Sequence, residues 1–98
     1  MYIKLHKAYR TIAAVCDSEI LGKKFEEGIK QLDIKENFYK GEEKSEAELI
    51  ELMKDLAMED VTFNIAGQQS IKCALKAGII NKKGIKQVQG IPFALVLL

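Results

Sequence analysis

The side chains best suited to chemistry in this sequence are one histidine and two cysteines, His6, Cys16 and Cys73. A thiol beside an imidazole can act as a nucleophile, and the same atom types bind zinc. Three such ligands cannot complete a tetrahedral structural zinc site, and the sequence has no CxxC or HxxxH spacing. The sequence therefore predicts no metal site and no cofactor.

A nucleophilic pair of Cys16 and His6 would depend on the pairing of two N-terminal strands. Alternating and β-branched residues predict strands over 2–7 and 11–16, joined around Tyr9-Arg10. A two-residue loop would place His6 and Cys16 on opposite faces of the sheet, where they cannot share a proton. A loop one residue longer would place the two side chains on the same face, but it would also divide the apolar residues of the hairpin between the two faces. The sequence thus favours a hairpin without a thiol enzyme.

Other catalytic motifs are missing from the sequence. The seven glycines are too far apart to form a dinucleotide-binding turn, a P-loop or a GxxG clamp. Adjacent acids such as Glu26-Glu27 and Glu59-Asp60 are expected on solvated edges rather than as a general acid and base. The two cysteines, in a chain without a secretion signal, are expected to be reduced and buried. These residues favour a non-catalytic protein.

Charged residues divide the chain into two basic ends and an acidic middle. Residues 1–24 hold five basic and two acidic groups, residues 25–60 hold five and twelve, and residues 61–98 hold five and none. We expect folding to bring the two basic ends together in one surface. Because a basic surface attracts phosphates, this surface is predicted to bind RNA or a ribonucleoprotein. With about five phosphate contacts, log affinity would fall with log salt with a slope of about −3.5 to −4.5.

A predicted helix over about 67–77 adds a second kind of anion site. Its first backbone amides have no partner within the helix, and Gly67 would let a phosphate approach them. Capping of this helix by Asn64 or by solvent is the alternative. The predicted anion- and RNA-binding residues are Lys4, Lys7, Arg10, Lys23, Lys24, Asn64, Gly67, Lys82, Lys83 and Lys86.

Two other functions remain open at this point. One is a protein–protein adaptor in which the acidic segment 36–60 meets a basic partner. The other is a small-anion or nucleotide enzyme that uses the start of the helix at Gly67. No membrane partner is expected, because the longest apolar run, Phe93 to Leu98, is far too short to span a bilayer.

The elements that would position these residues are expected to form a single α+β domain over residues 1–98. Its predicted core is one mixed, mostly antiparallel sheet with an N-terminal hairpin, two helices on one face and a buried C-terminal strand. The clearest local signal is Ser45-Glu46-Ala47-Glu48, which is typical of a capping box at the start of a helix. Gly78 is expected in the left-handed position that ends the second helix.

Weaker patterns predict the remaining elements. Further strands are expected over 29–34 and 85–89, while 35–41 is expected to be a turn anchored by Phe38 and Tyr39. Residues 61–65 are ambiguous between a strand and an irregular link. The C-terminal segment 93–98 lacks polar alternation, which predicts an internal strand covered on both faces. A frayed tail or a strand that pairs in a dimer is the alternative.

Several spaced motifs together carry a family resemblance. They are Cys16-Asp17, Leu21-Gly22-Lys23, Phe25-Glu26-Glu27-Gly28, Phe38-Tyr39, Gly41-Glu42, Asn64-Ile65-Ala66-Gly67, Ala74 with Gly78-Ile79-Ile80, and Val88-Gln89-Gly90-Ile91-Pro92. In this order they resemble a small archaeal family called domain of unknown function 424. The resemblance implies an archaeal cytoplasmic α+β domain with no established activity, whose members are discussed on indirect grounds as RNA-related. A histidine commonly follows the Gly-Ile-Pro segment in that family, where this chain has Phe93.

Overall fold

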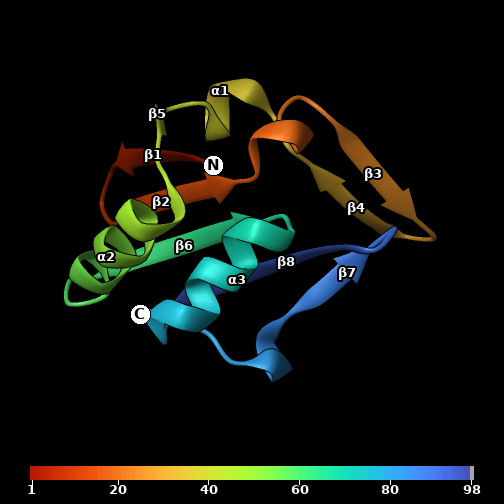
Figure 1. The fold of residues 1–98 in the computed structure, drawn as a ribbon. Helices are drawn as coiled ribbons and strands as arrows, with labels where there is room; N and C mark the ends of the chain where they lie inside the picture. The colour runs from red at the N-terminus through yellow and green to blue at the C-terminus, as the bar shows by residue number, and fades with distance from the viewer. Residues whose placement is uncertain (98) are drawn as a thin grey trace.

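A computed structural model describes residues 1–97 of the chain. Eight strands, three α-helices and two 3-10 turns follow one another in these residues as one continuous unit (Figure 1). In order, the elements are β1 (Tyr2–Lys7), β2 (Thr11–Cys16), the 3-10 turn η1 (Ser18–Ile20), β3 (Lys24–Glu27), β4 (Lys30–Asp33), α1 (Glu36–Tyr39), β5 (Glu42–Glu43), α2 (Glu46–Leu56), β6 (Val61–Ala66), α3 (Gln68–Ala77), η2 (Lys82–Gly84), β7 (Lys86–Val88) and β8 (Ile91–Leu97).

Six strands form one mixed sheet in the order β5-β1-β2-β6-β8-β7. Every neighbouring pair is antiparallel except β2 and β6, which run parallel at the centre. The strands β3 and β4 form a separate hairpin beside the main sheet (Figure 1). The predicted fold class, a mixed and mostly antiparallel sheet in an α+β chain, is therefore confirmed.

Hydrophobic side chains cover one face of the sheet and part of the other. On one face, Phe63 of β6 is fully buried with Leu49 and Met53 of α2, and α3 packs against the same cluster (Figure 1). On the other face, Ile34 and Tyr39 cover the carboxyl ends of β2 and β6. The two predicted helices thus share one face, and the short helix α1 with the β3–β4 hairpin covers part of the second. None of the helices within residues 1–97 has the length and apolar character needed to cross a membrane.

Local capping signals place both main helices as predicted. The backbone amide of Glu48 donates to Ser45 Oγ at 3.3 Å, and the Ser45 amide donates to Glu48 Oε1 at 3.0 Å, so the capping box is formed. Gly78 ends α3 with φ at +76°, where a side chain would strain the backbone. The amide of Ile79 then donates to the Ala74 carbonyl, as expected for this type of helix end.

The N-terminal hairpin has a longer loop than predicted. Tyr2 pairs with Cys16 and Lys7 pairs with Thr11, so residues 8–10 form a three-residue loop. His6 therefore lies opposite Ile12 and on the same face as Cys16, and the prediction of opposite faces is wrong. The two side chains still cannot form a catalytic pair, because four residues along the strands separate them by about 13 Å.

Three further predictions are corrected or refined. The expected strand over 29–34 is half of the β3–β4 hairpin, which turns at Gly28-Ile29. The ambiguous segment at 61–65 is the central strand β6. The C-terminal strand β8 is internal, between β6 and β7, as predicted. The prediction that both of its faces are covered is wrong, however, since Leu95 and Leu97 are 60% and 72% exposed.

Candidate nucleic-acid interface

The sheet carries an open face, defined here as the uncovered part of the side opposite α2 and α3. Strand pairing aligns its side chains in two rows that run across four strands. Because side chains alternate along a strand, the members of both rows point to the same side. One row is His6, Ile12, Thr62 and Leu97, and the other is Lys4, Ala14, Asn64 and Leu95. Ala14 and Thr62 are buried between their neighbours, and the other members of the rows are half-buried or exposed.

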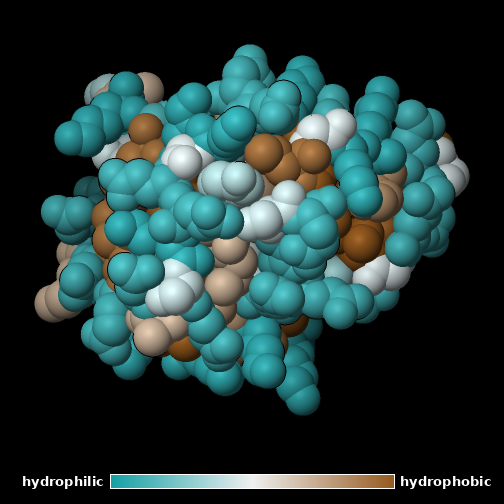
Figure 2. All heavy atoms as spheres, turned by 45° about the horizontal axis from the view of Figure 1, so that its top comes forward, coloured by the Kyte–Doolittle hydropathy of each residue, from teal (hydrophilic) through white to brown (hydrophobic). Residues whose placement is uncertain are grey.

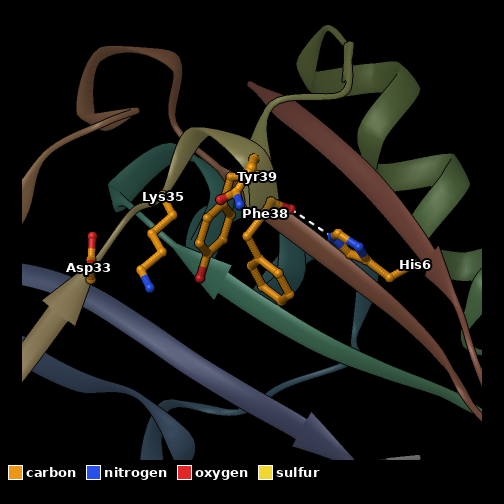
Figure 3. Close-up of a pocket in the computed structure, with 6 residues that line it drawn as sticks. His6, Asp33, Lys35, Phe38 and Tyr39 are labelled. Carbon is orange, nitrogen blue, oxygen red and sulfur yellow. Dashed lines mark hydrogen bonds between the residues drawn. The ribbon is translucent and has the colours of Figure 1, made fainter.

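The short helix α1 borders the open face and is tied to β1 by two side chains. His6 Nε2 lies 2.8 Å from the Phe38 carbonyl oxygen, and the two rings stack with centroids 4.6 Å apart at an angle of 14° (Figure 3). Because a carbonyl oxygen only accepts hydrogen bonds, Nε2 carries a proton. Lys4 Nζ donates to the Asn37 carbonyl oxygen at 2.8 Å. These contacts hold a flat aromatic pair at the edge of the open face.

A pocket of about 370 Å³ lies under α1 next to this aromatic pair. Figure 3 shows the Lys35 ammonium and the Tyr39 hydroxyl projecting to the same side as the Phe38 ring. Burial, followed by the nearby Cys16 and Asp33, raises the pKa of Tyr39 to about 12, so the hydroxyl keeps its proton at neutral pH. The lining residues are His6, Asp33, Lys35, Asn37, Phe38 and Tyr39. The ring faces and hydrogen-bonding groups of this set suit an unpaired base, and the Lys35 cation suits a phosphate, whereas the Asp33 carboxylate would repel a phosphate next to it.

The structure places three of the predicted binding residues on the side of the sheet that carries the open face. Lys4 and Asn64 belong to the same row, separated by Ala14 of β2. Lys86 pairs with Phe93, which pairs with Ala66, so it points to the same side from the far edge of the sheet. Two cations from opposite ends of the chain therefore flank the sheet, and Asn64 lies between them.

Other predicted residues lie elsewhere. Lys7 and Arg10 are at the β1–β2 loop, where Glu59 and Asp60 run alongside because Val61 pairs with Thr11. The remaining lysines belong to separate elements, with Lys23 and Lys24 at the start of β3 and Lys82 and Lys83 in η2. Arg10 precedes β2, whereas Lys86 is level with the other end of that strand. The register therefore separates Arg10 and Lys86 by two intervening strands and by the length of β2.

The predicted anion site at the start of α3 is already filled by a side chain of the protein. The amides of Gln69 and Ser70 donate to the Asp17 carboxylate at 3.0 and 2.7 Å, and Ser70 Oγ donates to it at 2.7 Å. These amides have no partner within the helix, as expected, but the Asp17 carboxylate takes the place predicted for an external anion. The alternative that Asn64 or solvent caps the helix is wrong for these two amides, because Asp17 caps them. Gly67 serves this internal contact, because a Cβ there would lie 2.6 and 2.7 Å from the two Asp17 oxygens.

Three important groups were missed from the sequence, namely the Asp17 cap, Lys35 and the His6–Phe38 stack. Asp17 follows β2 and Gly67 follows β6, so their approach is a consequence of the parallel pairing of Cys16 with Ala66. His6 and Phe38 are separated by 32 residues along the chain. The Asp17 cap could have been predicted if the parallel partner of the strand 11–16 had been recognised. No local sequence pattern indicates the aromatic stack.

The two cysteines are buried in the native protein and neither forms a disulfide. Burial, helped by the neighbouring Asp17, raises the pKa of the Cys16 thiol to about 12. Burial also raises the pKa of Cys73, whose Sγ lies 3.6 Å from Met1 Sδ. Both thiols are therefore protonated and shielded at neutral pH, which makes them poor nucleophiles.

We expect the native protein to resist iodoacetamide at pH 8, because only an accessible thiolate reacts quickly. Mass spectrometry after timed quenching should find less than about a tenth of each cysteine modified when the urea-unfolded chain is fully modified. Modification of native Cys16 as fast as in the unfolded chain would contradict the structural role of this residue.

Together, the fold and this site define a small α+β protein whose sheet is covered by two helices on one face and only partly covered on the other. The chain belongs to the family described as protein of unknown function (DUF424), whose model matches residues 6–98. It is similar to an uncharacterized conserved protein from Methanopyrus kandleri, known from a crystal structure, with 20% sequence identity and a TM-score of 0.84. That similarity covers 98% of this chain and 90% of the other, and it concerns the fold. No curated protein matches the chain.

Proposed function

We propose that this protein is a cytoplasmic, non-catalytic module that binds single-stranded RNA, alone or within a ribonucleoprotein, through the open face. The observation that carries the proposal is the joining of Lys4 and Asn64 in one row of the sheet, beside the stacked rings of His6 and Phe38. Cations hold phosphates without regard to sequence, whereas rings and amide groups contact bases. The open face offers both kinds of contact side by side.

Single-stranded RNA fits this surface better than a duplex does. Its bases are unstacked and can pack on aromatic rings and on the aliphatic floor made by Ile12, Leu95 and Leu97. Lys4 and Lys86 are four strand spacings apart, about 19 Å, so both can reach phosphates of one extended strand. A rigid A-form helix would present few unpaired bases to the His6–Phe38 pair.

The two other functions receive less support. Several acids of the segment 36–60 are already paired within the chain, such as Glu46 with Lys76 at 2.6 Å and Glu42 with Lys44 at 3.1 Å. The amides at the start of α3 are bound by Asp17, so a phosphate there would have to displace a carboxylate. Figure 2 shows the molecule with the top of Figure 1 turned toward the viewer. Hydrophilic residues cover most of the surface in this view, with smaller hydrophobic areas between them.

We expect a labelled single-stranded RNA of about 12 nucleotides to bind at 50 mM salt, with fluorescence anisotropy as the measurement. If Lys4, Lys35 and Lys86 each contact one phosphate, log affinity should fall with log salt with a slope of about −2. This value replaces the steeper slope expected when all basic segments bind together. A Lys4→Gln/Lys86→Gln variant should lower the magnitude of the slope by about 1.4.

The matched control is Lys72→Gln, which removes an exposed lysine from α3 on the opposite side of the sheet. It should bind RNA like the wild type. Absence of binding at 50 mM salt would contradict the proposal, and so would an equal loss in the control variant.

A further inference from the structure

The pocket under α1 contains an exposed carboxylate that the binding of phosphates does not explain. Asp33 ends β4 and is followed by Ile34, which is fully buried, and by Lys35, which is exposed. The backbone is still extended at Lys35, whose φ and ψ are −66° and 132°. Side chains alternate along an extended chain, so Asp33 and Lys35 point to the same side, with Cα atoms about 7 Å apart. They present an anion and a cation side by side in the pocket.

Both charged groups are available to a ligand. Within residues 1–97, the Asp33 carboxylate and the Lys35 ammonium form no hydrogen bond and no ion pair. Figure 3 shows these two side chains at one end of the pocket, the Tyr39 hydroxyl next to them, and the stacked rings of Phe38 and His6 at the other end. A flat ligand along the pocket would therefore meet a carboxylate, then a hydroxyl and finally the face of a ring.

The carboxylate determines which base fits this order of groups. An ionised carboxylate only accepts hydrogen bonds, and its two oxygens can accept from two neighbouring donors at once. Guanine is the common RNA base with two adjacent donors, N1–H and the N2 amino group, on its Watson–Crick edge. Adenine and cytosine have a ring nitrogen acceptor beside the amino group, and uracil has a single donor between two acceptors. With these three bases, a carboxylate oxygen would face an acceptor and lose one of its two hydrogen bonds.

We propose that this pocket selects a guanine base of the bound RNA, which rests on the RNA binding proposed above. Asp33 accepts from guanine N1–H and N2–H, and the Tyr39 hydroxyl donates to O6, which is the next group along the same edge. The rest of the base lies toward the Phe38 ring, where bases stack. Lys35 then faces the phosphate of the same nucleotide, and Asp33 contacts the base instead of a phosphate.

Fluorescence anisotropy with four labelled RNAs of about 12 nucleotides tests this base preference. One RNA contains only uridine, and the others carry a single guanosine, inosine or adenosine at the centre. We expect the wild type to bind the guanosine RNA at least about tenfold more tightly than the all-uridine RNA. Inosine lacks the N2 amino group, so its RNA should bind with an intermediate affinity. The adenosine RNA should bind within about threefold of the all-uridine RNA, because stacking tolerates every base.

Asp33→Asn tests the role of the carboxylate. The asparagine amino group would meet a donor of guanine, so the affinity for the guanosine RNA should fall at least about fivefold. The all-uridine RNA should bind as tightly as before or more tightly, because a charge that repels phosphates is removed. A folding defect would instead weaken the binding of both RNAs. The matched control is Asp55→Asn, the same change at an exposed residue of α2 across the sheet, which should leave all four affinities unaltered.

The outcomes separate this inference from RNA binding itself. Equal affinities of the wild type for the guanosine and adenosine RNAs would overturn the guanine pocket, while binding of the all-uridine RNA would still support the open face. A parallel loss for the guanosine and all-uridine RNAs in Asp33→Asn would also overturn the guanine pocket. Absence of binding to all four RNAs at 50 mM salt would overturn both proposals.

Discussion

An Asp17→Ala variant should lose about 3 kcal/mol of unfolding free energy relative to the wild type. Asp17 is buried at the end of β2, where its carboxylate accepts hydrogen bonds from the Gln69 and Ser70 amides and from the Ser70 hydroxyl. Alanine would remove all three bonds and leave the buried donors of Ser70 without their acceptor. Hydrogen bonds to a charged group contribute more than neutral ones, and an unsatisfied buried donor adds a further cost.

Urea unfolding followed by circular dichroism measures this loss. Glu19→Ala is the matched control, because Glu19 is an exposed acid two residues farther along, and its removal should change stability by less than about 0.5 kcal/mol. The unfolding free energy of Asp17→Asn should lie between those of Asp17→Ala and Glu19→Ala, since asparagine keeps one acceptor oxygen but loses the charge. A loss below about 1 kcal/mol in Asp17→Ala would contradict the role of Asp17 as the cap of α3.

Gly67→Ala should destabilise the protein by a similar amount, about 3 kcal/mol. Gly67 has a φ of +107°, a backbone conformation that residues with a side chain rarely adopt. Its missing Cβ also makes room for the Asp17 carboxylate, whose oxygens would lie 2.6 and 2.7 Å from an added carbon. The substitution would therefore strain the backbone and push the capping carboxylate away from the helix.

A double-mutant cycle separates these two causes. In an Asp17→Ala background the steric conflict is absent, so Gly67→Ala should cost only the backbone strain, about 1–2 kcal/mol. The two changes should therefore be less than additive by about 1 kcal/mol or more. Strict additivity would mean that Gly67 and Asp17 act independently, against the geometry described above.

Local signals predicted the elements that depend on a few neighbouring residues. The capping box at Ser45 and the left-handed glycine at Gly78 are formed, because the bonds that define them join residues close together in the chain. The internal position of the C-terminal strand was also predicted from its apolar run, although the coverage of both faces that this pattern implies is wrong.

Features that depend on pairing between distant segments could not be predicted. One extra residue in the loop before Thr11 reverses every side chain of β1 relative to β2, and nothing in the sequence fixes that loop length. The parallel contact of β2 with β6 brings Asp17 to the helix start at Gly67, which replaces a predicted anion site with an internal cap. The open face likewise arises because the segment 17–41 covers only one end of the sheet, as Leu95 and Leu97 reveal.

Nuclear magnetic resonance mapping with a single-stranded RNA tests the central claim most directly. Titration of the isotope-labelled protein should shift the amide signals of His6, Asn64 and Lys86 together, with saturation at one common affinity. Signals of Lys54 and Lys72, on the helices across the sheet, should stay in place. Shifts confined to α2 and α3, or none at all at 50 mM salt, would contradict RNA binding by the open face.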